Sequence, residues 1–162
     1  MRDMIDYMEA DPDMLESLVK GLSTNSDLYV HSVNVSVYTV AMARRMDVSD
    51  QEQLENLAIG GFLHDIGKSA VPAEILTKPG LLNPSEWVVV RRHPYRGRAL
   101  VSEAGDFGSI VFDCIVHHAE RVDGNGYPDG LLGSDIPEAA RIVAVADAFD
   151  ELMLSDGTYT EF

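Results

Sequence analysis

Apolar side chains recur every three or four residues along most of this chain, and that spacing predicts α-helices. We expect the main helices at residues 27–46, 49–64, 84–100, 109–118 and 137–154. The first is ambiguous, because Val33, Val35 and Val37 alternate as they would in a β-strand. We favour a helix there, since the apolar run is longer than an ordinary strand and contains neither Gly nor Pro. The pattern as a whole predicts an all-α fold.

Local signals refine where these elements start and stop. Capping boxes at residues 49–52 (Ser-Asp-Gln-Glu) and 83–86 (Asn-Pro-Ser-Glu) mark two helix starts. Pro94 is expected to bend or divide the helix that follows the second box. Residues 69–83 and the glycine-rich residues 122–136 are expected to be loops.

A chain of 162 residues has the size of one domain. We divide it into an N-terminal helix or connector at residues 1–24, where a weaker helical pattern occurs, and a domain at residues 25–162. No apolar run approaches the roughly 18 residues of a membrane span, and no apolar leader follows Met1. We therefore expect a cytoplasmic protein without a membrane span. The single Cys114 excludes an intrachain disulfide.

The net charge of the chain limits the class of molecule that it can bind. A net charge of −15 argues against duplex nucleic acid, because so acidic a surface repels polyphosphate. One basic patch departs from this acidity and is suited to a small anion. It consists of four arginines that flank His93 in the sequence, namely Arg91, Arg92, Arg96 and Arg98.

Five histidines and two carboxylates suggest a metal site. All five histidines fall on expected helices or helix ends: His31, His64, His93, His117 and His118. Asp65 and Asp147 lie among apolar neighbours, and a buried carboxylate needs a cation because leaving it unpaired costs several kcal/mol. Imidazole and carboxylate ligands without thiolates favour Fe, Mn, Zn or Ni in an open catalytic site, and their number fits two ions better than one. The alternative is that each histidine is an ordinary hydrogen-bonded core residue.

The same residues carry a resemblance to a known family. Segments in the order and spacing of the HD-GYP family cover residues 25 to 160. They are His31, His64-Asp65-Ile66-Gly67-Lys68, Lys78-Pro79-Gly80, His93-Pro94-Tyr95-Arg96-Gly97, His117-His118, Asp123-Gly124-Asn125-Gly126-Tyr127-Pro128 and Val145-Ala146-Asp147-Ala148-Phe149-Asp150.

The resemblance implies an all-α, HD-superfamily helical bundle with a metal site in its centre. Its active members hydrolyse cyclic di-GMP to pGpG or GMP, with two divalent ions, Fe or Mn in the first place, that polarise the phosphodiester and activate water. Asp65 would bridge the two ions and take part in catalysis. The ligands carried over by motif are His31, His64, Asp65, His93, His117, His118 and Asp147.

Three further roles follow from the resemblance, each with a simpler alternative. Lys68 would stabilise charge on the scissile phosphate, unless it is an ordinary surface lysine. Asp27 is a candidate ligand of a third ion, or else a solvated helix-capping residue. The loop residues Gly126, Tyr127 and Pro128, with Arg96, would line the rim of a cyclic dinucleotide pocket or dock a cyclase or sensor-domain partner, or else form a plain turn.

The sequence also departs from the family pattern. Ala119 separates His118 from Glu120, so either the loop absorbs one extra residue or one of His117 and His118 is displaced. The basic residues expected after Asp147 are missing from residues 155–160, and the closing helices of such domains are not seen. Two alternatives therefore stay open: a catalytically weak metal-binding sensor or docking module, and a hydrolase of another phosphoester or cyclic dinucleotide.

Overall fold

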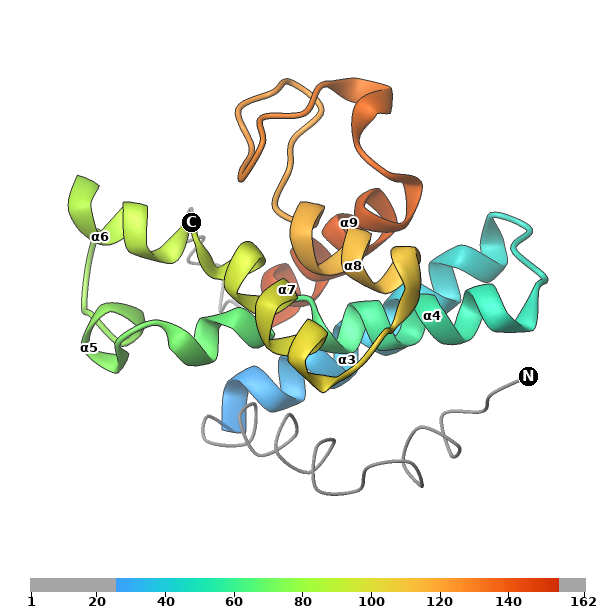
Figure 1. Ribbon diagram of the computed structural model, residues 1–162, viewed down its shortest axis with the longest axis horizontal. Helices are drawn as coiled ribbons and strands as arrows, with labels where there is room; N and C mark the ends of the chain where they lie inside the picture. The colour runs from blue at the N-terminus through green and yellow to red at the C-terminus, as the bar shows by residue number, and fades with distance from the viewer. Residues whose placement is uncertain (1–25, 155–162) are drawn as a thin grey trace.

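The computed structural model describes residues 26–154, and within them every regular element is helical (Figure 1). The α-helices and short 3-10 helices, labelled as in the figure, are α3 (Ser26–Arg45), α4 (Gln51–Leu63), η1 (Ile66–Ala70), α5 (Ala73–Leu76), α6 (Pro84–Val90), α7 (His93–Ala104), α8 (Gly108–His117), η2 (Gly133–Asp135) and α9 (Glu138–Leu154). The all-α prediction is confirmed. Within the same span, no helix is long and apolar enough to cross a membrane. The expected N-terminal helix or connector at residues 1–24 lies outside the described residues.

Most local signals agree with the observed helix ends. Residues 26–45 are helical, which resolves the ambiguity of the alternating valines. Asn83 and Glu86 form the predicted reciprocal capping box. The helix expected at residues 84–100 is divided near Pro94, as predicted: α6 ends at Val90 and α7 begins at His93. The first capping box is corrected by one residue: Asp50, not Ser49, caps α4, because its carboxylate accepts the N–H of Gln53 at 2.8 Å.

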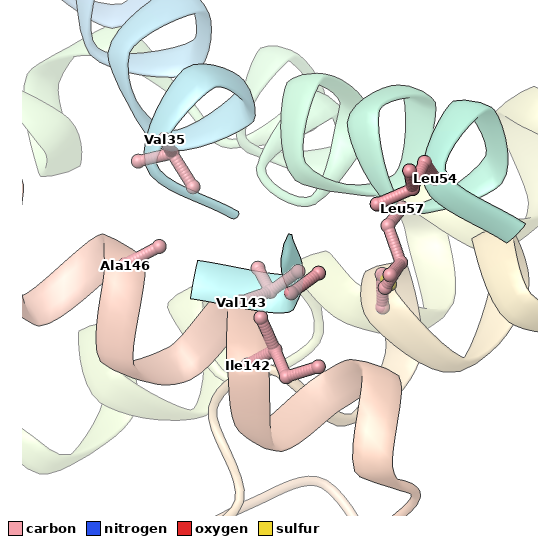
Figure 2. Packing of buried hydrophobic residues seen from close by; sticks show 8 residues of the cluster. Val35, Leu54, Leu57, Ile142, Val143 and Ala146 are labelled. Atoms are coloured by element: carbon pink, nitrogen blue, oxygen red, sulfur yellow. The ribbon is translucent and has the colours of Figure 1, made fainter. Parts of the chain in front are cut away.

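Helices α3, α4, α8 and α9 form the central packing unit (Figure 1). Helix α3 lies against α4 and α9, while α8 contacts both α4 and α9. Gly60 lets α4 approach α8 closely, because a Cβ there would lie 2.6 Å from Sγ of the buried Cys114. One apolar cluster fills the space between these helices; its labelled members in Figure 2 are Val35, Leu54, Leu57, Ile142, Val143 and Ala146.

A second apolar cluster attaches η1 and α7 to this unit. It includes Leu63 at the end of α4, Ile66 in η1 and Val101 in α7. Gly67 is pressed against the first turn of α7, since a Cβ there would lie 1.9 Å from the carbonyl oxygen of His93. The end of α4, which carries His64 and Asp65, is thereby held beside His93.

Candidate metal centre

Asp65 lies between α4 and η1, at the centre of a cluster of polar side chains, and is only 1% exposed. Its two carboxylate oxygens face different neighbours. Oδ1 lies 3.1 Å from Nε2 of His93 and 3.6 Å from Nε2 of His118. Oδ2 lies 3.5 Å from Nε2 of His64 and 2.6 Å from Nζ of Lys68. Asp65 therefore belongs to two donor groups at once.

The first group is completed by residues from α3 and α9. Nε2 of His31 lies 3.0 Å from Oδ1 of Asp147, and Nε2 of His64 lies 3.7 Å from the same oxygen. Single donor atoms of His31, His64 and Asp65 all lie within 4.8 Å of one another, and the same holds for Asp65, His93 and His118. Four helices and one helix junction thus bring together six of the expected ligands.

The histidines of the cluster direct their Nε2 atoms toward its centre. Nδ1 of His64 lies 2.7 Å from the carbonyl oxygen of Gly61, and Nδ1 of His93 lies 3.0 Å from that of Val90. A carbonyl oxygen can only accept, so each Nδ1 carries the hydrogen. His118 has the same arrangement with the preceding turn of α8. In the neutral rings, the Nε2 lone pairs are left free to bind a cation.

Burial leaves several of these atoms without partners. His64 Nε2, Asp65 Oδ1 and Asp147 Oδ1 are buried, and despite the short distances above none of them makes a hydrogen bond of suitable geometry with a described residue. Buried polar atoms are normally satisfied, because an unmet donor or acceptor costs about 1–3 kcal/mol. Lone pairs and carboxylates that converge without hydrogen bonds fit a divalent cation site.

The electrostatics of the cluster lead to the same conclusion. Burial disfavours the charged imidazolium of His64, but Asp65 and Asp147 outweigh burial and raise the pKa of His64 to about 10. Burial would raise the pKa of Asp65, yet Lys68 and His64 hold it well below its usual range. Burial lowers the pKa of His118, so this ring favours its neutral form. The carboxylates of Asp65 and Asp147 therefore need nearby positive charge. Either protons on the histidines or bound metal ions can provide it.

Two residues that sequence reasoning missed hold His31 in place. Asp150 is buried, and its Oδ2 accepts a hydrogen bond from Nδ1 of His31 at 2.7 Å. The amide of Asn34 donates to Oδ1 of Asp150 at 2.9 Å. The available signal was spacing: Asp150 follows Asp147 by three residues on α9, and Asn34 follows His31 by three on α3.

His117 is not brought to the cluster. Its Nε2 lies 3.3 Å from Oδ2 of Asp129, and its Nδ1 lies 3.9 Å from Oδ1 of Asp113. Successive residues at a helix end point about 100° apart, so His117 and His118 cannot face the same ion from α8. Of the two outcomes expected from the extra Ala119, the structure shows the displacement of His117.

The loop after α8 is anchored by Glu120, which sequence reasoning also missed. The Glu120 carboxylate is buried and accepts the backbone N–H groups of Asp129, Gly130 and Leu131. This anchoring holds the half-buried Tyr127, whose ring lies edge-on to that of His93 with centroids 6.0 Å apart. Burial raises the pKa of Tyr127 to about 12, so its phenol stays neutral.

Four other expected site residues have different positions in the structure. Lys68 reaches the cluster through Asp65, as given above. Arg96 instead donates to the carbonyl oxygen of Ala70 at 2.9 Å and so braces the end of η1. Gly126 is tightly enclosed, since a Cβ there would lie 2.2 Å from the nitrogen of Arg121. Asp27 belongs to the first turn of α3, but its side chain and residues 155–160 lie outside what the structure describes.

Comparison with known proteins shows which family this chain resembles. A family model described as "HD domain" matches residues 13–161. "Cyclic di-GMP phosphodiesterase PA4108" from Pseudomonas aeruginosa is 39% identical over 97% of this chain and 38% of the relative. "3'3'-cGAMP-specific phosphodiesterase 1" from Vibrio cholerae is 39% identical over 76% of this chain and 28% of the relative.

A solved structure extends the comparison to the fold. It is titled "Bd1817, a HDG"Y"P protein from Bdellovibrio bacteriovorus" and is 26% identical, with a TM-score of 0.65 over 83% of this chain and 48% of that chain. The chain spans less than two fifths of the length of both curated relatives above. From the matched span, the fold and the motifs around Asp65, the chain belongs to the HD-domain family and, within it, to the HD-GYP proteins.

Proposed function

We propose that this chain hydrolyses a cyclic dinucleotide, with cyclic di-GMP as the first candidate substrate and pGpG or GMP as the product. One observation carries the proposal: Asp65 is shared by two groups of buried or half-buried donors, as a two-metal phosphodiesterase site requires. The relative from Pseudomonas aeruginosa, whose name specifies cyclic di-GMP, supports the choice of substrate.

In this proposal the donor groups hold two ions, with Fe and Mn as the preferred metals. His31, His64 and Asp147 would hold one ion, His93 and His118 the other, and Asp65 would bridge them. When bound, the ions would polarise the phosphodiester and lower the pKa of the attacking water. A third ion at Asp27 stays a prediction.

Besides holding the ions, the protein would contribute to catalysis through Lys68. Its ammonium group lies 2.6 Å from Asp65, and although burial opposes the charge, Asp65 and Asp147 raise the pKa of Lys68. The side chain is 30% exposed, so it can also reach a bound phosphate. Lys68 would therefore remain cationic and stabilise the charge that develops on the scissile phosphate.

The test is hydrolysis of cyclic di-GMP under anaerobic conditions with added Mn²⁺ or Fe²⁺, followed by chromatography of the products. We expect metal-dependent turnover that Asp65→Asn abolishes and that Lys68→Ala lowers by about 10²–10³-fold. Lys78→Ala is the matched control, because Lys78 pairs with Glu86 on a different segment and should leave the rate unchanged. Tight binding of cyclic di-GMP without turnover would contradict the proposed hydrolysis. It would favour the alternative of a catalytically weak metal-binding sensor module.

A second candidate substrate is 3'3'-cGAMP. The relative from Vibrio cholerae supports it, because its name specifies that dinucleotide. The ratio of kcat/KM for the two substrates decides between them. A cyclase or sensor-domain partner at the loop around Tyr127 also stays a prediction, since no described contact bears on it.

A further inference from the structure

We propose that Arg91 is a specificity-determining residue that binds the phosphate of the cyclic dinucleotide that is not cleaved. This inference rests on the proposed function and assigns a residue to one part of the substrate. A cyclic dinucleotide carries two phosphates, and the metal centre with Lys68 can engage one of them. The other needs a cation at a fixed place beside the centre.

Arg91 occupies such a place. It caps the end of α6, and its Cζ lies 5.5 Å from the ring centroid of Trp87 and 5.5 Å from that of Tyr127. The Tyr127 ring in turn lies edge-on to His93, one of the candidate ligands. A single aromatic ring therefore separates the guanidinium group from the metal centre.

The guanidinium group is also available to a ligand. Arg91 is exposed, and within residues 26–154 no ion pair or hydrogen bond engages its side chain. Two other nearby cations have partners: Lys78 is paired with Glu86 at 2.6 Å, and Arg96 donates to a carbonyl oxygen. The N–H donors of Arg91 have no such partner among the described residues and lie beside Tyr127, so they can bind an anion there.

Stacking prepares Arg91 for that role. Contact with two aromatic rings orders a long side chain that would otherwise lose conformational freedom on binding. A cation–π contact uses none of the N–H donors in a hydrogen bond, and the donors along an edge of the planar group match two phosphate oxygens. The contacts with Trp87 and Tyr127 thus orient the group without using its donors.

The test compares two substrates in the metal-loaded protein. Cyclic di-GMP has a second phosphate, whereas bis(p-nitrophenyl) phosphate has only the one that is cleaved. We expect Arg91→Ala to raise KM for cyclic di-GMP about 10- to 100-fold, as for loss of a charged hydrogen bond, and to change kcat less than 3-fold. Activity on bis(p-nitrophenyl) phosphate and bound metal should not change. Arg91→Lys should fall between Arg91→Ala and wild type.

Arg98→Ala is the matched control. The sequence grouped Arg98 with Arg91 in one basic patch, but in the structure the exposed Arg98 has its Cζ 5.7 Å from the Phe112 centroid, and no contact with Tyr127 is found among the described residues. It should leave both activities unchanged. Equal losses on both substrates in Arg91→Ala, or the same KM as in Arg98→Ala, would overturn the proposal.

A binding measurement separates failure of this inference from failure of the proposed function. If wild type does not hydrolyse cyclic di-GMP, the proposed function fails, and calorimetry still tests Arg91. Binding that Arg91→Ala weakens at least 10-fold would support the inference. Binding that Arg91→Ala leaves unchanged, or no binding to wild type, would overturn it.

Discussion

His93 and His118 face each other with their Nε2 atoms 3.2 Å apart, although the Nδ1 of each already faces a backbone carbonyl oxygen. Two neutral rings in this arrangement direct lone pairs at each other. The repulsion is relieved only if a proton or a metal ion lies beside both nitrogens. Oδ1 of Asp65, 3.1 Å from Nε2 of His93, supplies the third donor to that position.

Adjacent histidines at the end of α8 are expected to behave differently. His118→Ala should remove a ligand and lower activity at least 100-fold with loss of bound metal. His117→Ala should keep the metal content of wild type, because His117 contacts Asp129 and not the cluster. Elemental analysis of the two variants checks this. Equal metal loss in both would contradict the geometry.

Stability without metal should fall as pH rises. The pKa of His64 is about 10 in the fold and about 6.5 in the unfolded chain, so its proton stabilises the fold fully below pH 6.5, and this contribution is lost as pH rises through 10. Between pH 7 and 9 the free energy of unfolding should drop by about 2 kcal/mol. Urea unfolding of chelator-treated protein measures this. His64→Gln is the control and should reduce the slope; an unchanged slope would refute the assignment.

Asp150 should act as a positioning residue for His31. It accepts the Nδ1–H of His31, and removal of such an outer partner typically costs about 10–100-fold in metal affinity. Asp150→Ala should show that loss in a competition titration with a chromophoric chelator. Asn34→Ala, which removes only the donor to Asp150, should have a smaller effect. Unaltered metal affinity in Asp150→Ala would show that His31 needs no such support.

Gly67→Ala should be strongly destabilising. The new Cβ would lie 1.9 Å from the carbonyl oxygen of His93 and 2.5 Å from the nitrogen of Gly97, so η1 and α7 would have to separate. We expect the free energy of unfolding to fall by about 3 kcal/mol or more, as measured by denaturant unfolding. Gly80→Ala meets no atom within 4 Å and carries only the strain of its φ of 89°, so it should cost about 1 kcal/mol. Equal losses in the two variants would argue against the close contact.

Helix positions were predictable wherever a local signal specified them. The capping box at Asn83 and the break at Pro94 depend on neighbouring residues alone, and both appear in the structure. The alternating valines of α3 gave no local signal that distinguishes a helix from a strand. Val35 is fully buried, whereas Val37 is 60% exposed, because helix packing and not residue type decides which face is covered.

The candidate site was predictable in its residue types and less so in its supporting contacts. His64, Asp65 and Asp147 could be selected because charged or polar groups in apolar runs need partners. Glu120 could not, since a carboxylate beside a loop is usually solvated until the fold buries it, and Asp150 was indicated only by its spacing of three residues from Asp147. The choice between His117 and His118 required the orientation of the end of α8.

The most direct test of the two-metal site is the metal content of the anaerobically purified chain, measured by elemental analysis against protein concentration. We predict two Fe or Mn ions per chain, both lost or greatly reduced in Asp65→Asn. A folded wild-type chain that retains fewer than one ion, even after incubation with excess Mn²⁺ or Fe²⁺, would contradict it.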